Sequence, residues 1–261
     1  MARTDRLPVV RVEGARAPGP FLFVCEHASA AIPAEYGDLG LTAAQRASHI
    51  AWDPGALGLA RALARRLDAP LVHAGVSRLV YDLNRPPHAP GAIALRSEIH
   101  DIPGNRDLPD GERLRRTRAL YLPFHDRLRA EIALRLAAGH AFALVTVHSF
   151  TPVWFGTPRA VELGLIHDAD NRMATAMLRH AQVLTGLVAR LNDPYSAADG
   201  VAHTLALHAT PMGLPHVMIE VRNDLIATPA AQAKMAAQLS PCLAAAWADV
   251  ADPKEVSCRA G

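Results

Sequence analysis

Residues capable of chemistry follow four short apolar segments of this chain, at the points where those segments end. The four clusters are Glu26-His27, Asp82-Leu83-Asn84-Arg85, His148-Ser149 and Glu220-Val221-Arg222. Imidazole and carboxylate groups are common ligands of a hydrolytic zinc ion and common general bases. One such cluster is ordinarily a strand that runs out into solvent, but four clusters of similar composition favour a shared site.

His27 and His148 are the best candidate metal ligands. A catalytic zinc ion usually has three protein ligands and one position open to water, so a third ligand is required. Asp53, Glu26 and His49 are the alternatives. Asp53 could instead cap a helix, Glu26 would point to the opposite face of a regular strand from His27, and His49 lies one helical turn before Asp53. The chain has no H-E-x-x-H motif.

Glu220 is the best candidate general base. It ends the apolar run Val217-Met218-Ile219, which predicts partial burial. Partial burial raises the pKa of a carboxyl group toward the range useful for proton transfer. The alternative is an ion pair with Arg222, two positions away on the same strand face. Glu26 is a second candidate catalytic carboxylate.

Arginines near these clusters predict a small anionic substrate. Arg78, Arg85 and Arg222 flank the four clusters, and a guanidinium group matches a carboxylate with two parallel hydrogen bonds. Asn84 and Ser149 are further candidate substrate-binding residues. Ser149 has no G-x-S-x-G context, so it is not predicted to be a nucleophile.

Most of the other histidines fall into two groups. We expect Tyr195 and His203 to lie on an active-site loop. Structural roles are predicted for His88, His100, His125, His140, His167, His180, His208 and His216. Cys25 precedes Glu26 directly, but no Cys-His-Asn order supports a thiol nucleophile.

Short apolar runs that alternate with amphipathic helices position these clusters. Strands are predicted at 21–25, 70–74, 77–83, 141–147, 161–166, 188–192 and 217–221, and helices at 43–67 with a break near 53, 112–138, 169–184 and 229–250. This alternation predicts an α/β three-layer fold with a mostly parallel, mixed central sheet. Ligands of such sheets bind beyond the carboxyl ends of the strands, where the four clusters would meet.

Composition bounds the class of protein. The 261 residues are 50% hydrophobic and 20% charged, which is enough for a sizeable core. No repeat or low-complexity linker divides the chain, so we expect one domain over 1–261 with a loop insertion around 86–110. The net charge of +2 gives no reason to expect nucleic acid. Three cysteines, no apolar leader and no membrane-spanning stretch predict a cytoplasmic protein.

Several segments resemble N-formylglutamate amidohydrolases in order and spacing over roughly residues 20 to 230. They are Cys25-Glu26-His27-Ala28-Ser29, His49-Ile50-Ala51-Trp52-Asp53, the run from Ser77 to Arg85 (SRLVYDLNR), Val147-His148-Ser149-Phe150 and the run from Ile219 to Leu225 (IEVRNDL). Family members that act in histidine breakdown tend to have Pro-His-Ser-Gly where this chain has Glu26-His27-Ala28-Ser29. This chain therefore resembles a more divergent branch.

The resemblance implies a zinc-exopeptidase-like fold, a divalent metal ion and hydrolysis of N-formyl-L-glutamate to formate and L-glutamate. It also makes His148 similar to the second zinc histidine of carboxypeptidase-type enzymes, and Glu220 similar to their general base. Those enzymes have H-x-x-E at the first metal motif, whereas His27 is followed by Ala28-Ser29-Ala30. Two other hypotheses are a peptidase or amidase of the same fold that acts on a peptide or cell-wall fragment, and a non-catalytic ligand-binding relative.

Overall fold

A seven-stranded mixed sheet forms the centre of the computed structural model, which describes residues 7–251. The strands in chain order are β1 (Val10–Glu13), β2 (Phe21–Cys25), β3 (Leu71–Ala74), β6 (Ala143–Phe150), β9 (Leu163–Ile166), β10 (Ala189–Leu191) and β11 (His216–Arg222). Their order in the sheet is β1-β3-β2-β6-β11-β9-β10. The neighbours β3, β2, β6 and β11 are parallel, while β1 and β9 run antiparallel to the strands that they join to this central group.

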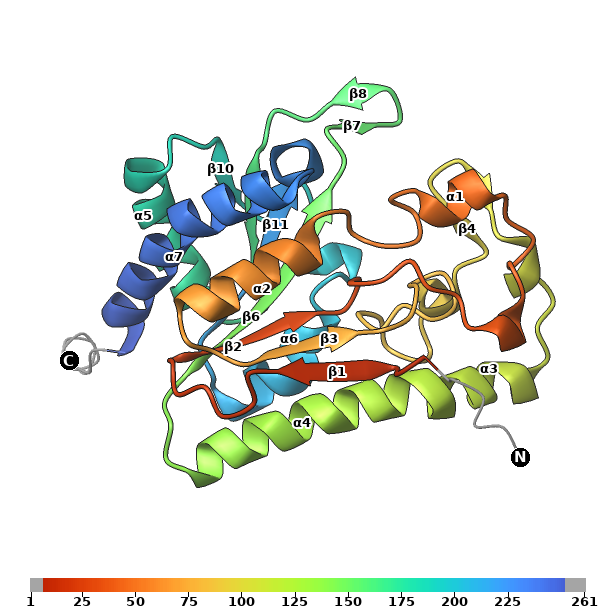
Figure 1. Cartoon of the computed structure of the whole chain (residues 1–261), viewed down its shortest axis with the longest axis horizontal. Coiled ribbons are helices and arrows are strands. Elements are labelled where there is room, and N and C mark those ends of the chain that lie inside the picture. The colour runs from red at the N-terminus through yellow and green to blue at the C-terminus, as the bar shows by residue number, and fades with distance from the viewer. Residues whose placement is uncertain (1–6, 252–261) are drawn as a thin grey trace.

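Helices cover both faces of the sheet, as Figure 1 shows. The helices in chain order are α1 (Ala43–Ala47), α2 (Ala56–Arg66), α3 (Asp110–Arg116), α4 (Leu122–Ala137), α5 (Arg172–Leu184), α6 (His203–His208) and α7 (Pro229–Ala251). One face packs against α2, α5 and α7, and the other packs against α4 and α6. The expectation of an α/β three-layer fold is therefore confirmed.

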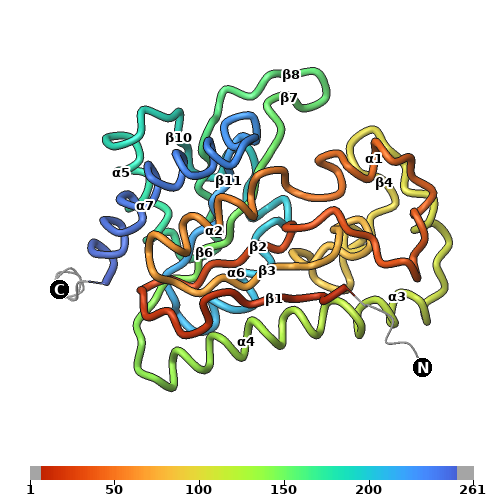
Figure 2. The backbone as a smooth tube through the Cα atoms, in the orientation of Figure 1, coloured from red at the N-terminus to blue at the C-terminus, as the bar shows by residue number. Residues whose placement is uncertain are grey.

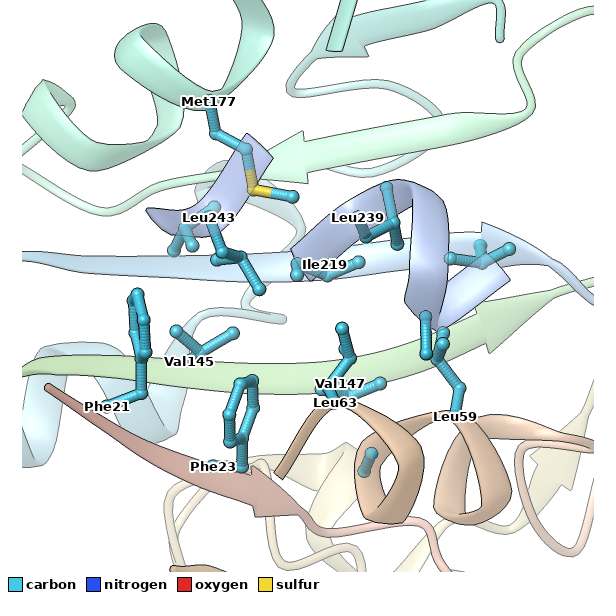
Figure 3. Close-up of a cluster of buried hydrophobic side chains, with 14 of the residues drawn as sticks. Phe21, Phe23, Leu59, Leu63, Val145, Val147, Met177, Ile219, Leu239 and Leu243 are labelled. Atoms are coloured by element: carbon cyan, nitrogen blue, oxygen red, sulfur yellow. The ribbon is translucent and has the colours of Figure 1, made fainter. Parts of the chain in front are cut away.

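Successive side chains of each buried strand point to opposite faces of the sheet, so each strand contributes to both hydrophobic cores. Phe21 and Phe23 of β2 point into the layer of α2 and α7, while Leu22 and Val24 point into the layer of α4. Figure 3 shows the first of these cores, in which Leu63 of α2 lies among strand residues. Strands that are covered on both faces read as continuous apolar runs, and this property made 21–25 recognisable in the sequence.

The helix α2 begins after Gly55, not after Asp53. Gly55 occupies the N-cap position with φ +83°, and no side chain caps this helix. A Cβ atom at Gly55 would lie 2.4 Å from the carbonyl oxygen of Ile226, so glycine is required both for its backbone angle and for this close approach. The carboxylate of Asp53 is consequently free for another role.

The expectation of a strand at 77–83 was wrong. This segment forms turns, with the hydroxyl of Ser77 donating to the carbonyl of Ala51 and accepting from the amide of Leu79. A local side-chain hydrogen bond of this kind offers the backbone an alternative to a sheet. The segment thus crosses the end of the sheet as a loop beyond β3.

Short elements also occupy segments where no strand was expected. The strand β1 precedes the first expected strand, and the expected loop insertion around 86–110 holds β4 (Arg96–Ser97) and β5 (His100–Asp101) among turns. After β6 the chain forms the hairpin of β7 (Val153–Trp154) and β8 (Thr157–Pro158), which projects beyond the sheet (Figure 2). The expected helix 112–138 is α3 and α4 joined by a π-helical turn.

Cys25 and Cys242 are buried and form no disulfide bond with each other, and Cys258 lies outside the described residues. None of the helices within residues 7–251 has the length and apolar composition needed to cross a membrane.

Candidate functional site

A pocket of about 480 Å³ lies at the carboxyl ends of the central parallel strands. Its wall comes from the ends of β2, β6 and β11, from the turn before α2, and from loops at 78–85 and 194–201. His27, Asp53, His148 and Glu220 all line it. The topology therefore brings together residues from four distant parts of the sequence, as expected for a mostly parallel sheet.

The imidazole of His27 is held between two aspartates. Its Nε2 atom lies 2.7 Å from Oδ1 of Asp82, and its Nδ1 atom lies 3.3 Å from Oδ2 of Asp53. All three side chains are nearly inaccessible to solvent. Burial opposes the charged form of Asp82, but the adjacent His27 and Arg78 hold its pKa well below the usual value. Asp82 is therefore a carboxylate that orients the imidazole of His27.

The imidazole of His148 has a similar arrangement. Its Nδ1 atom lies 2.9 Å from the same Oδ2 atom of Asp53, and its Nε2 atom lies 3.1 Å from Oε2 of Glu26. Burial disfavours an imidazolium, yet Glu26 and Asp53 raise the pKa of His148 well above its usual value. The same oxygen of Asp53 also accepts from the backbone amide of Ser149, 3.3 Å away.

The donor set of His27, Asp53 and His148 fits a metal ion. One ligand atom from each residue lies within 4.8 Å of the other two, and all three residues are buried. The nitrogen atoms that face away from Asp53 lie against Asp82 and Glu26. Metal-binding histidines commonly present their second ring nitrogen to a carboxylate in this way, which sets the tautomer and the ring orientation.

The three alternatives for a third ligand occupy different places. Asp53 lies between the two histidines. Glu26 lies behind His148 and does not line the pocket, so its carboxylate has no access to a bound substrate. His49 lines the pocket, but its Nε2 atom lies 2.8 Å from Oε2 of Glu98.

Glu220 lies beside His148 at the pocket wall. The two residues are in register on the parallel strands β11 and β6. Oε2 of Glu220 is buried and has no hydrogen-bond partner among residues 7–251. Burial, reinforced by the charge of Asp53, raises the pKa of Glu220 to about 7, although His148 opposes this rise. A carboxyl group with this pKa can both accept and return a proton near neutral pH.

The backbone opposite Glu220 is a glycine. Gly164 of β9 pairs with Glu220, and a Cβ atom at Gly164 would lie 2.3 Å from the carbonyl oxygen of Asp193 and 3.2 Å from Cβ of Glu220. Any larger residue would therefore displace the carboxylate or the segment that leads to Tyr195.

The three predicted substrate arginines have different surroundings. Arg78 lines the pocket, but its guanidinium lies 2.8 Å from Oδ2 of Asp82 and 3.4 Å from Oδ1 of Asp53, so its charge is already matched. Arg85 lines the pocket and donates to the backbone carbonyl of Asp199. Arg222 does not line the pocket, because its guanidinium forms ion pairs with Glu162 and Asp224 instead.

Asn84 and Ser149 line the pocket but use their polar atoms within the protein. The amide of Asn84 donates to the carbonyl of Val201 and accepts from the backbone amide of Thr204, 3.0 Å away. The hydroxyl of Ser149 donates to the carbonyl of Pro54 at 2.8 Å. These bonds hold the surrounding loops, so the two side chains act within the protein as positioning residues.

Comparison with known proteins identifies the family. The family model described as N-formylglutamate amidohydrolase matches residues 19–227. The chain belongs to this family. No curated protein matches the chain.

Two solved structures are similar over almost their whole length. A gene product from Agrobacterium tumefaciens, Atu2144, is 54% identical over 94% of this chain and 96% of its own, with a TM-score of 0.92. The N-formylglutamate amidohydrolase from Ralstonia eutropha JMP134 is 18% identical over 93% of this chain and 98% of its own, with a TM-score of 0.67. The family match means that the chain is a hydrolase, and the likeness to the Ralstonia structure supports the fold.

Among the pocket residues to which sequence reasoning gave no role are Asp82 and Arg159. Asp82 was treated only as part of a polar cluster, although its spacing of four from Arg78 could have indicated an ion pair. Arg159 also lines the pocket, and nothing in its local sequence distinguishes it from other surface arginines.

The expected active-site loop lies at the pocket only in part. Tyr195 lines the pocket, whereas His203 accepts or donates a hydrogen bond at the hydroxyl of Tyr121, 2.8 Å away. The predicted structural roles suit His125 and His208, which are buried and 2.9 Å apart through Nδ1 and Nε2. Burial lowers the pKa of His125 to about 3, so this pair is neutral at pH 7.

Proposed function

We propose that this chain hydrolyses the amide bond of an N-formyl amino acid, with N-formyl-L-glutamate as the first candidate substrate, and that the reaction requires a divalent metal ion, zinc by preference. The observation that supports this is the convergence of two imidazole nitrogens and one carboxylate oxygen beside Glu220 in one pocket. Two histidines with one carboxylate are a common catalytic zinc set, and zinc has no redox chemistry to add.

The metal ion would be held by His27, Asp53 and His148, and it would supply Lewis acidity to the acyl carbonyl and to the attacking water. Asp82 and Glu26 lie against the Nε2 atoms of the two imidazoles and would favour the tautomers whose Nδ1 atoms are free to bind the metal ion. Arg78 balances part of the negative charge that these carboxylates bring together.

Glu220 moves the protons of the reaction. It accepts a proton from the water that attacks the formyl carbon, and it delivers that proton to the amino group that leaves. Its Oε2 atom has no hydrogen-bond partner among residues 7–251, and burial raises the pKa of its carboxyl group, which suits both steps. Arg85, which has no carboxylate partner among residues 7–251, would bind a carboxylate of the substrate.

The test is hydrolysis by the full chain after zinc loading, with free L-glutamate as the product measured. N-formyl-, N-acetyl- and N-glycyl-L-glutamate are compared at equal concentration. We expect the formyl compound to have the highest kcat/KM, and chelation followed by zinc addition to abolish and restore turnover. Absence of turnover on the formyl compound by zinc-loaded protein, or turnover that a chelator does not change, refutes the corresponding part of the proposal.

The size of the pocket favours a second candidate class of substrate. About 480 Å³ lies within the range of pockets that hold drug-sized ligands. A larger N-acyl or peptidyl amino acid would fill it more completely than a formyl compound. Higher kcat/KM for N-glycyl-L-glutamate than for the formyl compound would favour this alternative.

A further inference from the structure

The guanidinium of Arg159 lies among aromatic rings at the pocket wall. Its Cζ atom is 4.9 Å from the ring centre of Trp154, 5.0 Å from that of Tyr195 and 5.4 Å from that of Phe150. All four residues line the pocket. Rings at these distances attract a cation and hold the planar group in place.

Arg159 has unused hydrogen-bonding capacity. Its Nη1 atom donates to the hydroxyl oxygen of Tyr195 at 3.2 Å and to the carbonyl of Thr151 at 3.4 Å. Within residues 7–251 its Nε and Nη2 atoms make no hydrogen bond and the side chain makes no ion pair. These two atoms form one edge of the guanidinium fork, which matches the two oxygens of a carboxylate.

A comparison of Arg159 with Arg78 indicates that the guanidinium of Arg159 serves to bind a ligand. Arg78 already lies against two carboxylates of the protein, whereas Arg159 is a pocket cation that forms no ion pair in the described part of the chain. Arg159 is also only partly exposed, so solvent does not fully replace a missing partner. An arginine that is positioned by three rings and matched by no acid is suited to an anion that arrives with the substrate.

The hydroxyl of Tyr195 adds a second donor. Because its oxygen accepts from Arg159, its own hydrogen is available to another acceptor. Burial, together with the nearby Glu220, raises the pKa of Tyr195, so the hydroxyl keeps its proton at neutral pH. The side chain lines the same pocket as the candidate metal ligands.

We propose that Arg159 and Tyr195 form a carboxylate-binding subsite, separate from Arg85, and that this subsite selects the substrate of the pocket by its second carboxylate. The two arginines of the pocket that lack an acidic partner then each bind one carboxylate. This inference rests on the proposed function only in assigning the bound dicarboxylate to the substrate of the same pocket.

The test is calorimetric titration of the full chain, as purified, with glutarate and with butyrate. Glutarate carries two carboxylates and butyrate one, so a contribution from a metal ion or from Arg85 is common to both probes. We expect wild-type protein to bind glutarate more tightly than butyrate. Replacement Arg159→Met should weaken glutarate binding by about 10- to 100-fold, as expected for the loss of charge-assisted hydrogen bonds. Binding of butyrate should change by far less.

Two further variants separate charge from geometry. Arg159→Lys keeps the charge but not the fork, so it should recover only part of the glutarate affinity. Tyr195→Phe should weaken glutarate binding by about 2- to 10-fold through the loss of one neutral donor. Arg106→Met is the matched control, because Arg106 is exposed and pairs with Asp101 at 2.8 Å. The control should bind both probes as wild type does.

The outcomes for this subsite and for the proposed function are distinguishable. If no N-formyl compound is hydrolysed but glutarate binding still depends on Arg159, the proposed reaction fails and the subsite stands. If N-formyl-L-glutamate is hydrolysed but the ratio of glutarate to butyrate affinity is unchanged in both Arg159→Met and Tyr195→Phe, the subsite is overturned and the reaction stands.

Discussion

Replacement of Glu220 by glutamine should stabilise the metal-free protein and at the same time abolish most of its turnover. A glutamine side chain has nearly the shape of the protonated carboxyl group, but its amide neither accepts nor gives up a proton near neutral pH. The carboxylate form of Glu220 is disfavoured by burial, which raises its pKa to about 7 from an ordinary value of 4.5. The substitution therefore removes an ionisation that the folded state resists.

The size and sign of the stability change follow from this pKa. The raised pKa means that the folded state keeps a proton that the unfolded state has lost between pH 4.5 and about 7. The free energy of unfolding of wild-type protein therefore falls with rising pH across this window. The loss corresponds to about 3 kcal/mol when it is complete. Glu220→Gln should show no gain near pH 4 and a gain approaching this value at pH 8.

Urea denaturation of the metal-free proteins at pH 4 and pH 8 measures the change directly. Asp126→Asn is the matched control, since its exposed carboxylate pairs with Arg129 on the surface of α4 and should contribute little at either pH. In the zinc-loaded enzyme the same Glu220→Gln variant should lose about 10²- to 10⁴-fold in kcat while retaining the metal ion. Equal stability of variant and wild type at pH 8 would show that folding does not raise the pKa of Glu220, and unchanged kcat would remove Glu220 from the reaction.

Three other perturbations test the metal ligands, the turn before α2 and the core. Zinc at 100 times its dissociation constant should stabilise the protein by about 2.7 kcal/mol in thermal denaturation. Asp53→Asn should remove most of this stabilisation. An equal stabilisation of that variant by zinc would contradict the proposed ligand set. Gly55→Ala should lower the free energy of unfolding in urea by more than about 1 kcal/mol and should weaken zinc binding. The reason is that φ is +83° and that the new methyl group would meet the backbone of Ile226. Unaltered zinc affinity would show that this turn does not position Asp53. Leu63→Ala should lower the free energy of unfolding by about 2–5 kcal/mol, while the specific activity of the folded enzyme stays constant. A smaller loss of stability would mean that the core collapses around the missing side chain.

The layered fold could be predicted from the sequence because its strands are strongly apolar. Phe21 to Cys25 is completely buried and forms a strand, as its run of apolar residues indicates. The failure at 77–83 has a local cause, since Leu79 and Tyr81 are buried without being part of a sheet. Burial alone does not distinguish a strand from a tightly packed loop, and the hydrogen bonds of Ser77 decide between them here.

Only those site residues that directly follow a predicted strand could be predicted from the sequence. His27, His148 and Glu220 each close an apolar run, so periodicity pointed to them. Asp53 precedes a helix, and its role depends on Gly55, whose positive φ is a property of the folded chain. The ion pair of Arg222 with Glu162 and the contact of Arg159 with Tyr195 depend on packing between segments far apart in the sequence, and no local pattern predicts either of them.

The contacts of Asn84 and Arg85 bear on how this pocket could diverge. Both side chains hold the 199–204 segment through its main-chain atoms: the carbonyls of Asp199 and Val201 and the amide of Thr204. A segment that is held by its backbone can exchange most of its side chains and still keep its path. New ligand preferences could therefore arise on this wall by single substitutions, while the residues at the strand ends stay unchanged.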